Sequence, residues 1–338
     1  MKPYISVIIA SYDRVQFIYE AIQSVMNQTL SPEMYEIIVV TGFPLDSRFS
    51  TAQRIKSLHS NERNLGPKIV QALKHANGEI ISLLDDDDIF LPSKLKTIAD
   101  IFLNDRKVGF VHNWMSFISE NGETSIKYFM EKVTKRVNSC GFYFIDPTKA
   151  SFSDIRYALS LSMDFNSSSI SIRKSILMGF LSTLSRITTA ADDFYFYAAL
   201  TSGLLLISIP NKLTGYRVHK SNVSRSYGDS VGFLSMKLNY DRKVLSDSSE
   251  ILGMASSAPN LSISKAINWK ISATIMEMSW LGENMSRIKL LKQIFHHLHF
   301  VGSALLTFDL TLLAYSIICL MDLKYARALY LFQFHTQI

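Results

Sequence analysis

The stretch Glu79-Ile-Ile-Ser-Leu-Leu84 is followed at once by four aspartates, Asp85 to Asp88. A short apolar run that ends in polar residues predicts a buried strand of an α/β sheet, and such sheets bind ligands just beyond the carboxyl ends of their strands. Adjacent carboxylates repel one another unless a cation or hydrogen-bond donors take up the charge. Because aspartate oxygens suit Mg2+ or Mn2+, which bridge to phosphates, we expect a divalent cation and a phosphorylated ligand here. A solvated acidic turn is the alternative.

The composition indicates a folded protein with room for more than one domain. Of the 338 residues 48% are hydrophobic and 19% charged, so we expect little disorder and some surface that faces lipid or a partner. The net charge of +6 suits an anionic ligand such as a nucleotide, whereas no motif indicates nucleic-acid binding. Two distant cysteines, Cys140 and Cys319, and a start without a secretory signal favour a cytoplasmic protein.

Strand and helix patterns alternate through the first part of the chain. Apolar runs predict strands at 4–10, 35–40, 79–84 and 108–112, and helical spacing predicts helices near 15–26, 67–76 and 92–102. This order predicts a mostly parallel α/β sheet with right-handed crossovers and with ligand sites along one edge. Residues 119–162 show no clear period, and we expect an acceptor-side insertion or mobile loop there.

The second part of the chain turns from strands to helices. Strands are predicted at 167–172, 204–209 and 213–218, the last two separated by a turn at Pro210-Asn211, and helices at 174–180 and 192–200. Beyond Ser221 the pattern is helical, at about 226–250, 261–282, 286–299 and 302–334 with a break near Asp322.

In their order along the chain, the motifs resemble those of a family 2 glycosyltransferase of the GT-A fold. They are Ile5-Ser-Val-Ile-Ile-Ala-Ser-Tyr-Asp-Arg14, Glu36-Ile-Ile-Val-Val40, Asn64-Leu-Gly66, Gly78-Glu79, Leu84-Asp-Asp-Asp-Asp88, Pro92-Ser-Lys-Leu95, Ala191-Asp-Asp193 and Tyr216-Arg-Val-His219. The resemblance covers residue 4 to about 224. It implies transfer of a sugar from a nucleoside-diphosphate sugar to a hydroxyl, with inversion at the anomeric carbon.

The resemblance also divides the chain. A Rossmann-like GT-A catalytic domain is expected over 1–224, with a nucleotide-sugar-binding half over about 1–115 and an acceptor half over 116–224. A C-terminal helical region is expected over 225–338.

In this family the aspartate cluster is the DxD motif, in which one aspartate lies near the donor ribose and another on the divalent ion. Matching register assigns Asp85 and Asp86 to the donor and Asp87, with Asp85 in reserve, to Mn2+ or Mg2+, while Asp88 is expected to cap the following segment. His219 resembles an element that lies near the donor phosphates and could complete the metal shell, and Arg217 could meet an anion. A surface polar role is the alternative for His219.

Other candidate donor-binding residues lie in the loop after the first strand, on the second strand and on the third helix. They are Ser11, Tyr12, Asp13, Arg14, Thr41 and Lys68. Relatives usually carry an aspartate just after the second strand, where it binds the nucleotide base, but this chain has Thr41. A UDP-sugar and a GDP-sugar therefore both remain open. Asp13 could touch the base or ribose or cap the next helix, and Lys68 could reach phosphate or be solvated.

The attacking hydroxyl needs a general base, and Asp192 and Asp193 are the candidates. Their position resembles the family's Glu-Asp pair at a helix start, where the second member is the base. Asp193 is therefore the predicted base and Asp192 the reserve. The alternative is that these aspartates cap the helix that follows.

The C-terminal helices raise the question of a membrane. Residues 300–321 are long and apolar enough to span a bilayer, but Asp309 would cost about 2.5–3.5 kcal/mol at its centre. We expect helices that pack on the catalytic domain or lie in the membrane interface through nearby basic residues, and spanning stays open. The basic residues are Lys289, Lys292, Lys324 and Arg327. A glycan or a lipid-linked acceptor would suit either arrangement.

Two other functions stay open. A nucleotidyltransferase also uses aspartates and a divalent ion, but it would release pyrophosphate and usually relies on a glycine-rich phosphate loop, which the segment 11–14 lacks. The second alternative is a protein of the same fold that binds a nucleotide sugar without turnover. It stays open because Thr41 departs from the family pattern.

Overall fold

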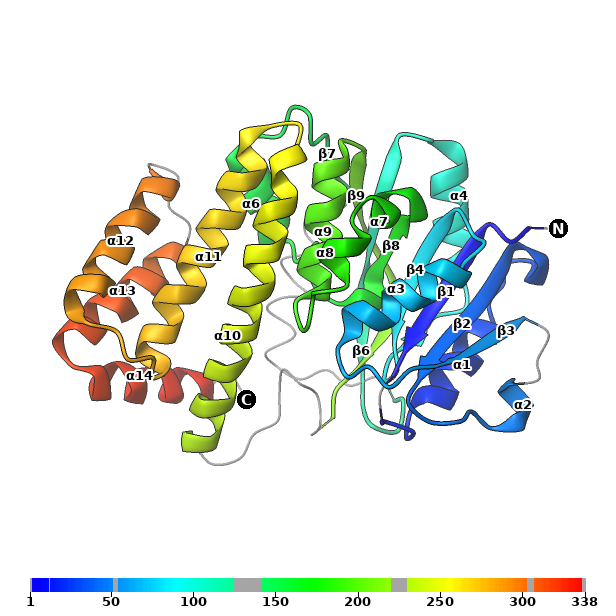
Figure 1. Ribbon diagram of the computed structural model, residues 1–338, viewed down its shortest axis with the longest axis horizontal. Coiled ribbons are helices and arrows are strands. Elements are labelled where there is room, and N and C mark those ends of the chain that lie inside the picture. The colour runs from blue at the N-terminus through cyan, green and yellow to red at the C-terminus, as the bar shows by residue number, and fades with distance from the viewer. Residues whose placement is uncertain are drawn as a thin grey trace.

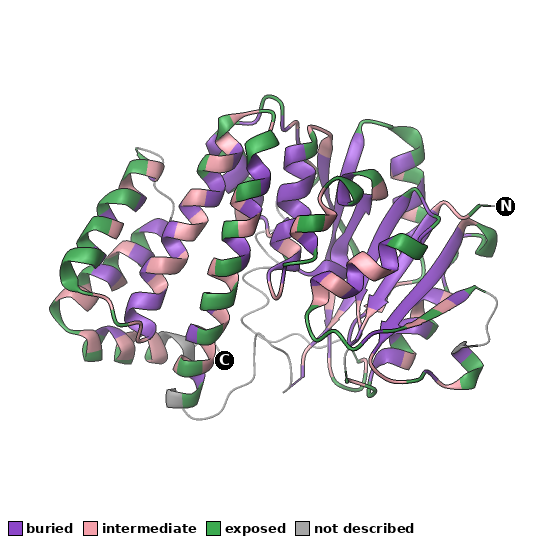
Figure 2. Cartoon of the chain, viewed as in Figure 1, coloured by how far each residue is buried: buried purple, intermediate pink, exposed green. Residues whose placement is uncertain are grey.

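The computed structural model describes residues 2–11, 13–50, 54–123, 141–219, 230–302 and 307–335. Figure 1 shows an α/β region that contains the N-terminus at one end of the molecule and a group of helices at the other. Helices α10 (Ser230–Met254) and α11 (Leu261–Leu281) stand between them. The strands are buried along most of their length, as the purple ribbons in Figure 2 show.

The first part of the sheet is parallel, as the sequence predicts. Its strands lie in the order β3-β2-β1-β4. They are β1 (Ile5–Ala10), β2 (Tyr35–Thr41), β3 (Ile55–His59) and β4 (Ile80–Asp85), and the helices among them are α1 (Ile18–Met26), α2 (Ser47–Ser50) and α3 (Leu65–His75). Ala10 pairs with both Val40 and Asp85, so the loop after β1 and the aspartates after β4 start side by side at one edge of the sheet.

The second part of the sheet is mixed. After β4 the order continues β8-β6-β9-β5, with β4–β8 and β8–β6 antiparallel and β6–β9 parallel, and β7 pairs with β9. These strands are β5 (Ile89–Phe90), β6 (Val108–Ile118), β7 (Tyr143–Ile145), β8 (Ile170–Arg173) and β9 (Leu205–Arg217).

The predicted turn at Pro210-Asn211 is wrong. Strand β9 runs through these residues without a reversal. Its register against β6 shifts there, since Asn113 pairs with Ile209 whereas Trp114 pairs with Lys212. The extra residues form a bulge, which accommodates a proline that has no N–H to offer the sheet.

Helices cover the sheet and fill part of the predicted insertion. They are α4 (Lys94–Asn104), α6 (Phe152–Ser160), α7 (Lys174–Gly179), α8 (Leu181–Leu184) and α9 (Ala191–Ser202). The expectation of irregular structure over 119–162 is wrong for its second half, where β7 and α6 lie. Residues 124–140 lie outside the described part of the chain.

The C-terminal helices begin and end within about five residues of the predicted bounds, and the predicted break is present. They are α12 (Arg287–Val301), α13 (Thr307–Met321) and α14 (Leu323–His335), which begins after Asp322. Residues of α10 and α11, such as Ile251 and Ile267, share the core that lies under α9, whereas α12 to α14 pack in a cluster with the far ends of α10 and α11. The expected boundary at 224/225 lies outside the described residues.

Asp309, the residue that interrupts the apolar stretch, lies inside the helical region. Its carboxylate accepts hydrogen bonds from Arg156 of α6 and from Trp269 Nε1 at 2.9 Å, and His297 Nε2 lies 3.1 Å from the same oxygen as the indole. These contacts join α6, α11, α12 and α13. Across the described residues, no helix combines the length and the apolar character that crossing a bilayer requires.

Candidate active site

The aspartate cluster forms a buried turn at the end of β4. Asp86, Asp87 and Asp88 are 3%, 7% and 1% exposed. Burial and repulsion from neighbouring aspartates raise the pKa of Asp85 well above its ordinary value. The same causes raise the pKa of Asp88 to about 8, and burial raises the pKa of Asp86 despite the nearby Arg14. The turn therefore disfavours full ionisation of its carboxyl groups, and a bound cation would favour it.

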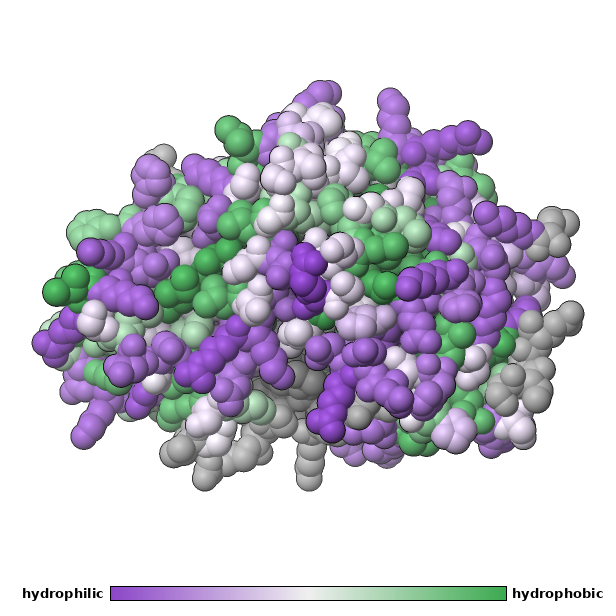
Figure 3. All heavy atoms as spheres, in the orientation of Figure 1, coloured by the Kyte–Doolittle hydropathy of each residue, from purple (hydrophilic) through white to green (hydrophobic). Residues whose placement is uncertain are grey.

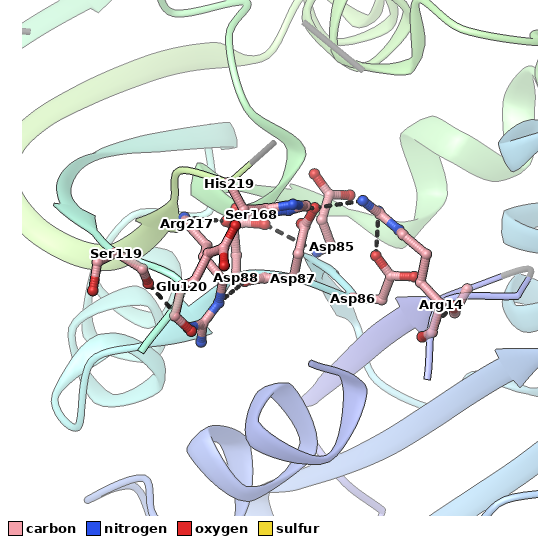
Figure 4. A network of polar contacts seen from close by, with 11 residues as sticks. Arg14, Asp85, Asp86, Asp87, Asp88, Ser119, Glu120, Ser168, Arg217 and His219 are labelled. Atoms are coloured by element: carbon pink, nitrogen blue, oxygen red, sulfur yellow. Dashed lines mark hydrogen bonds and ion pairs between the residues drawn. The ribbon is translucent and has the colours of Figure 1, made fainter. Parts of the chain in front are cut away.

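Arg14 lies against this cluster. Its guanidinium donates to Asp86 and, over 2.7 Å, to Asp87 Oδ2, so the loop after β1 supplies a cation to the aspartates. Figure 4 shows Asp87 between Arg14 on one side and His219 on the other. Burial raises the pKa of Asp87, but the hydrogen bond with His219 and the charge of Arg14 together bring it below its ordinary value.

His219 and Asp87 form the pair that sequence reasoning assigned to a metal. His219 Nε2 lies 3.1 Å from Asp87 Oδ2, and the imidazole is buried. Among the residues that the structure describes, no group of three or more His, Cys, Asp or Glu side chains is arranged to hold a metal ion. A Mg2+ or Mn2+ ion commonly takes only one or two protein ligands and completes its shell with water and phosphate oxygens, so a carboxylate and an imidazole at this spacing fit such an ion.

Arg217 and Asp88 have structural roles, and that of Asp88 corrects an expectation. The Arg217 guanidinium is fully buried and donates to the carbonyls of Asp87 at 2.7 Å and Glu120 at 2.7 Å and to the carboxylate of Glu20. It therefore holds the aspartate turn and pairs with a carboxylate of α1. Asp88 Oδ1 accepts from the backbone N–H of Arg217 at 2.8 Å, so it ties β9 to the turn and does not cap α4.

The remaining donor-side candidates differ in what they can reach. The Thr41 hydroxyl is buried and donates to Phe43 O at 2.6 Å, so it is committed to its own turn. Ser11 is buried beside Arg14, whereas Asp13 is exposed at the mouth of the loop. Burial lowers the pKa of Lys68, while Asp86 and Asp13 oppose this shift, so Lys68 lies in the field of the cluster. Tyr12 lies outside the described residues.

Asp192 and Asp193 lie in the first turn of α9 and do not cap it. The residue before the helix is Ala190, which offers no side-chain hydrogen bond. Asp192 accepts from the backbone N–H of Asn166 at 3.0 Å and from the Ser167 hydroxyl, so it holds the loop before β8. Burial raises the pKa of Asp192 to about 6. Burial also raises the pKa of Asp193 to about 7, against the charge of a nearby lysine.

Two neighbouring serines join the aspartate cluster to the candidate base. They belong to the 3-10 turn η2 (Ser167–Ser169). Ser167 donates to Asp192, and Ser168 Oγ accepts from the backbone N–H of Asp85 at 2.9 Å. Consistent with this short link, the charge of Asp192 contributes to the raised pKa of Asp85. The two acidic groups predicted from separate motifs therefore meet at one edge of the sheet.

Sequence reasoning missed two residues next to Asp193. Lys270 of α11 donates to Asp193 and, over 2.8 Å, to Asp164 Oδ2. Asp164 lies just after the segment 119–162 that shows no clear period and before the strand predicted at 167–172, and no local signal indicated it. Lys270 has a signal, because it continues a helical stripe of buried apolar residues that includes Ile263 and Ala266. A charge on such a stripe predicts a buried partner.

Known proteins of similar sequence support a family assignment. The family model described as glycosyl transferase family 2 matches residues 6–177, about half of the chain. An uncharacterized glycosyltransferase of Methanocaldococcus jannaschii is 32% identical over 141 residues, which is 39% of this chain and 48% of that protein. The chain thus matches less than half of the length of this relative.

Solved structures share the fold at low identity. TarS of S. aureus superposes with a TM-score of 0.56 and 14% identity over 96% of this chain and 54% of TarS. TarS 1–349 with UDP-GlcNAc gives a TM-score of 0.50 and 14% identity over 93% of this chain and 90% of that one. The mannosyltransferase PcManGT of Pyrobaculum calidifontis, in complex with GDP-Man and Mn2+, gives 0.54 and 15% identity over 97% and 87%. Motifs, fold and family match agree, and the chain belongs to glycosyl transferase family 2.

Proposed function

We propose that this protein transfers a sugar from a nucleoside-diphosphate sugar to a hydroxyl of a glycan or lipid-linked acceptor, with inversion at the anomeric carbon. The observation that carries the proposal is the link through Ser167 and Ser168, which holds the aspartate cluster and the Asp192–Asp193 pair at the same edge of the sheet. Inverting transfer needs a site for the leaving diphosphate and a base for the attacking hydroxyl within one pocket.

On the donor side, Asp87 and His219 are the residues that would hold a divalent cation, with Asp85 in reserve. Such an ion supplies Lewis-acid stabilisation of the departing nucleoside diphosphate. Arg14 already neutralises part of the cluster and is half-exposed, so its guanidinium can also meet a phosphate oxygen. Asp86 and Asp13 are proposed to face the ribose or base. The matched structures with UDP-GlcNAc and with GDP-Man and Mn2+ support this class of donor.

On the acceptor side, Asp193 is the proposed base. A carboxylate with a pKa of about 7 is partly ionised at neutral pH and can take a proton with little energetic mismatch. As the acceptor oxygen bonds to the anomeric carbon, its proton moves to the Asp193 carboxylate and the bond to the nucleoside diphosphate breaks. The side chain is 12% exposed, so an acceptor hydroxyl can reach it.

The test separates binding from turnover. In a thermal-shift screen of UDP- and GDP-sugars with Mn2+, a true donor raises the melting temperature because it binds only the folded protein. Asp87→Ala is expected to lose this shift. Asp193→Asn is expected to keep the shift but to lose about 10²–10⁴ in the rate of nucleoside-diphosphate release. Undiminished release by Asp193→Asn would refute its role.

The products distinguish the alternatives. A nucleotidyltransferase would release pyrophosphate, and a protein that only binds would show the thermal shift without release of any nucleotide. The family match favours sugar transfer over both. Detection of pyrophosphate would favour the nucleotidyltransferase. Binding without turnover across a broad acceptor panel would favour the protein that only binds.

A peripheral membrane contact is proposed for the acceptor side of the reaction. Helix α12 exposes Ile288, Leu291 and Phe295 at helical spacing, and Lys289 and Lys292 lie among them. This pattern suits an interfacial helix on anionic lipid. On the face drawn in Figure 3, apolar side chains lie interspersed with hydrophilic ones. The protein should sediment with anionic vesicles, and Phe295→Ser should lower the fraction that sediments. Equal binding to neutral vesicles would contradict a contact that depends on anionic lipid.

A further inference from the structure

Lys270 brings the C-terminal helices into the active site. It belongs to α11, yet its ammonium group contacts Asp193 of α9 and Asp164 of the loop before η2. The side chains of Lys270, Asp164 and Asp193 are 25%, 15% and 12% exposed. The group is therefore shielded from most of the solvent but still reachable by an acceptor hydroxyl.

We propose that Lys270 is a positioning residue for the Asp193 base, so that the C-terminal helices take part in catalysis. This inference rests on the proposed function of Asp193. Lys270 does not touch the reacting atoms in this role. It orients the carboxylate and keeps it ionised until the acceptor proton arrives.

The shared contact suits a proton transfer. Before the reaction, one ammonium faces two carboxylates, and the three groups carry a net charge of −1. When a proton moves from the acceptor hydroxyl to Asp193, Lys270 keeps Asp164 as its counter-ion and the group becomes neutral. Without Lys270 the two carboxylates would repel each other and Asp193 would hold its proton more tightly.

The position of Lys270 is fixed by packing. Its neighbours on α11, Ile263, Ala266 and Ile267, are buried in the same core as Phe194 and Tyr197 of α9. Trp269, the adjacent residue, donates to the buried Asp309. A side chain on a packed helix holds a partner with better-defined geometry than one on a loop.

Other groups also act on Asp193, and each is unchanged by a substitution at position 270. The titratable side chains that face it from its own and the neighbouring elements, besides Lys270, are Asp164, Asp192, Tyr197 and Tyr240. Because these groups stay in place, a change in the titration of Asp193 in a Lys270 variant reports the loss of the ammonium.

The first experiment needs no substrate. The melting temperatures of the wild type, Lys270→Met, Asp193→Asn and the double variant are measured at pH 5 and at pH 8. If the contact is between charges, the two substitutions are non-additive at pH 8, where Asp193 is ionised, and additive at pH 5, where it is protonated. Additivity at both values, or equal coupling at both, would overturn the inference, because a packing contact does not depend on ionisation.

The second experiment measures how the catalytic rate depends on pH. Release of nucleoside diphosphate from UDP-GlcNAc and from GDP-mannose with Mn2+ is followed from pH 5 to 9. In Lys270→Met the acid limb of the profile should move up by at least about one pH unit, which lowers the rate on that limb about tenfold, and the rate should recover at high pH. Lys270→Arg should keep the wild-type profile because it keeps the positive charge. Lys265 is an exposed lysine of the same helix, and Lys265→Met should leave the profile unchanged.

The outcomes are distinguishable. An unmoved acid limb in Lys270→Met, in a protein whose Asp193→Asn variant is inactive, overturns the inference and leaves the proposed function intact. Absence of nucleotide release by the wild type would instead refute the proposed function. The melting cycle separates the two failures because it requires no donor.

Discussion

Replacement of Asp309 by alanine should lower the free energy of unfolding more than any other single substitution in the C-terminal helices. It should do so by weakening the packing of these helices on the α/β region. The carboxylate is fully buried and its Arg156 partner is 2% exposed. Removal of one member of a buried ion pair typically costs about 3–5 kcal/mol. Asp309 also accepts from Trp269 and contacts His297, so we expect a loss near the middle of this range, about 4 kcal/mol.

The assay is a urea titration followed by far-ultraviolet circular dichroism, with thermal melting as a second measure. For a chain of 338 residues, a loss of about 4 kcal/mol corresponds to a melting temperature lower by roughly 6 °C. The matched control is Asp100→Ala, which breaks the exposed Lys96–Asp100 pair and should cost no more than about 0.5 kcal/mol.

A double replacement separates charge from shape. Arg156→Met with Asp309→Leu removes both ions, and apolar replacement of a buried pair is often neutral or stabilising. This variant should therefore be more stable than Asp309→Ala. The reasoning fails if Asp309→Ala costs less than about 1 kcal/mol, or if the double variant is the less stable of the two.

Three further substitutions test the other buried polar groups. Arg217→Met should cost about 3 kcal/mol or more in urea unfolding, and calorimetry should show a weaker nucleotide affinity of the folded protein because Arg217 holds the aspartate turn. Thr41→Val should cost about 0.5–1.5 kcal/mol through the lost bond to Phe43 and should not change the nucleotide affinity. Burial lowers the pKa of His112 to about 4, so the unfolded chain binds a proton first as pH falls below 6.5, and stability declines toward pH 4. His112→Gln, which keeps a donor for Phe165 O, should lose this part of the pH dependence, on the order of 3 kcal/mol.

The elements that could be predicted are those whose signal is local. The apolar run before Asp85 gives β4, and the break at Asp322 gives the end of α13, because each depends on a few consecutive residues. Helix α6 could also have been found. Its start carries a capping box in which Ser151 and Asp154 bond each other's backbone N–H, a spacing that can be read from the sequence.

Strand β9 could not be read correctly from local residues. Proline is rare inside sheets, so Pro210 favoured a turn between two strands. The strand continues because β9 takes up the extra residues as a bulge opposite Asn113 and Trp114 of its partner β6. That partner lies about a hundred residues earlier, and its register is set by the assembled sheet.

In the candidate site, too, some features could be predicted from the sequence and others could not. That Asp87 and His219 lie close together could be predicted because both belong to recognisable motifs at strand ends, whereas their role in metal binding stays a prediction. The hydrogen bonds of Arg217 and Thr41 could not be predicted in this way: Arg217 donates to the carbonyl of Glu120, and Thr41 donates to Phe43 O of its own turn. Motif matching assigns a position to a residue, but it does not show which partner its side chain has.

The cations of the site come from different parts of the chain on its two sides. Arg14, which meets the aspartate cluster, follows β1 and is brought there by the pairing of β1 with β4. Lys270, which meets Asp193, is brought there by the packing of α11 against α9, and the two residues are 77 positions apart. The parallel pairing of strands fixes the proposed donor side of the pocket, although Arg14 and Asp87 are 73 positions apart. The proposed acceptor side depends on helix packing, so we expect changes in α11 to retune the proposed base without altering the proposed donor site.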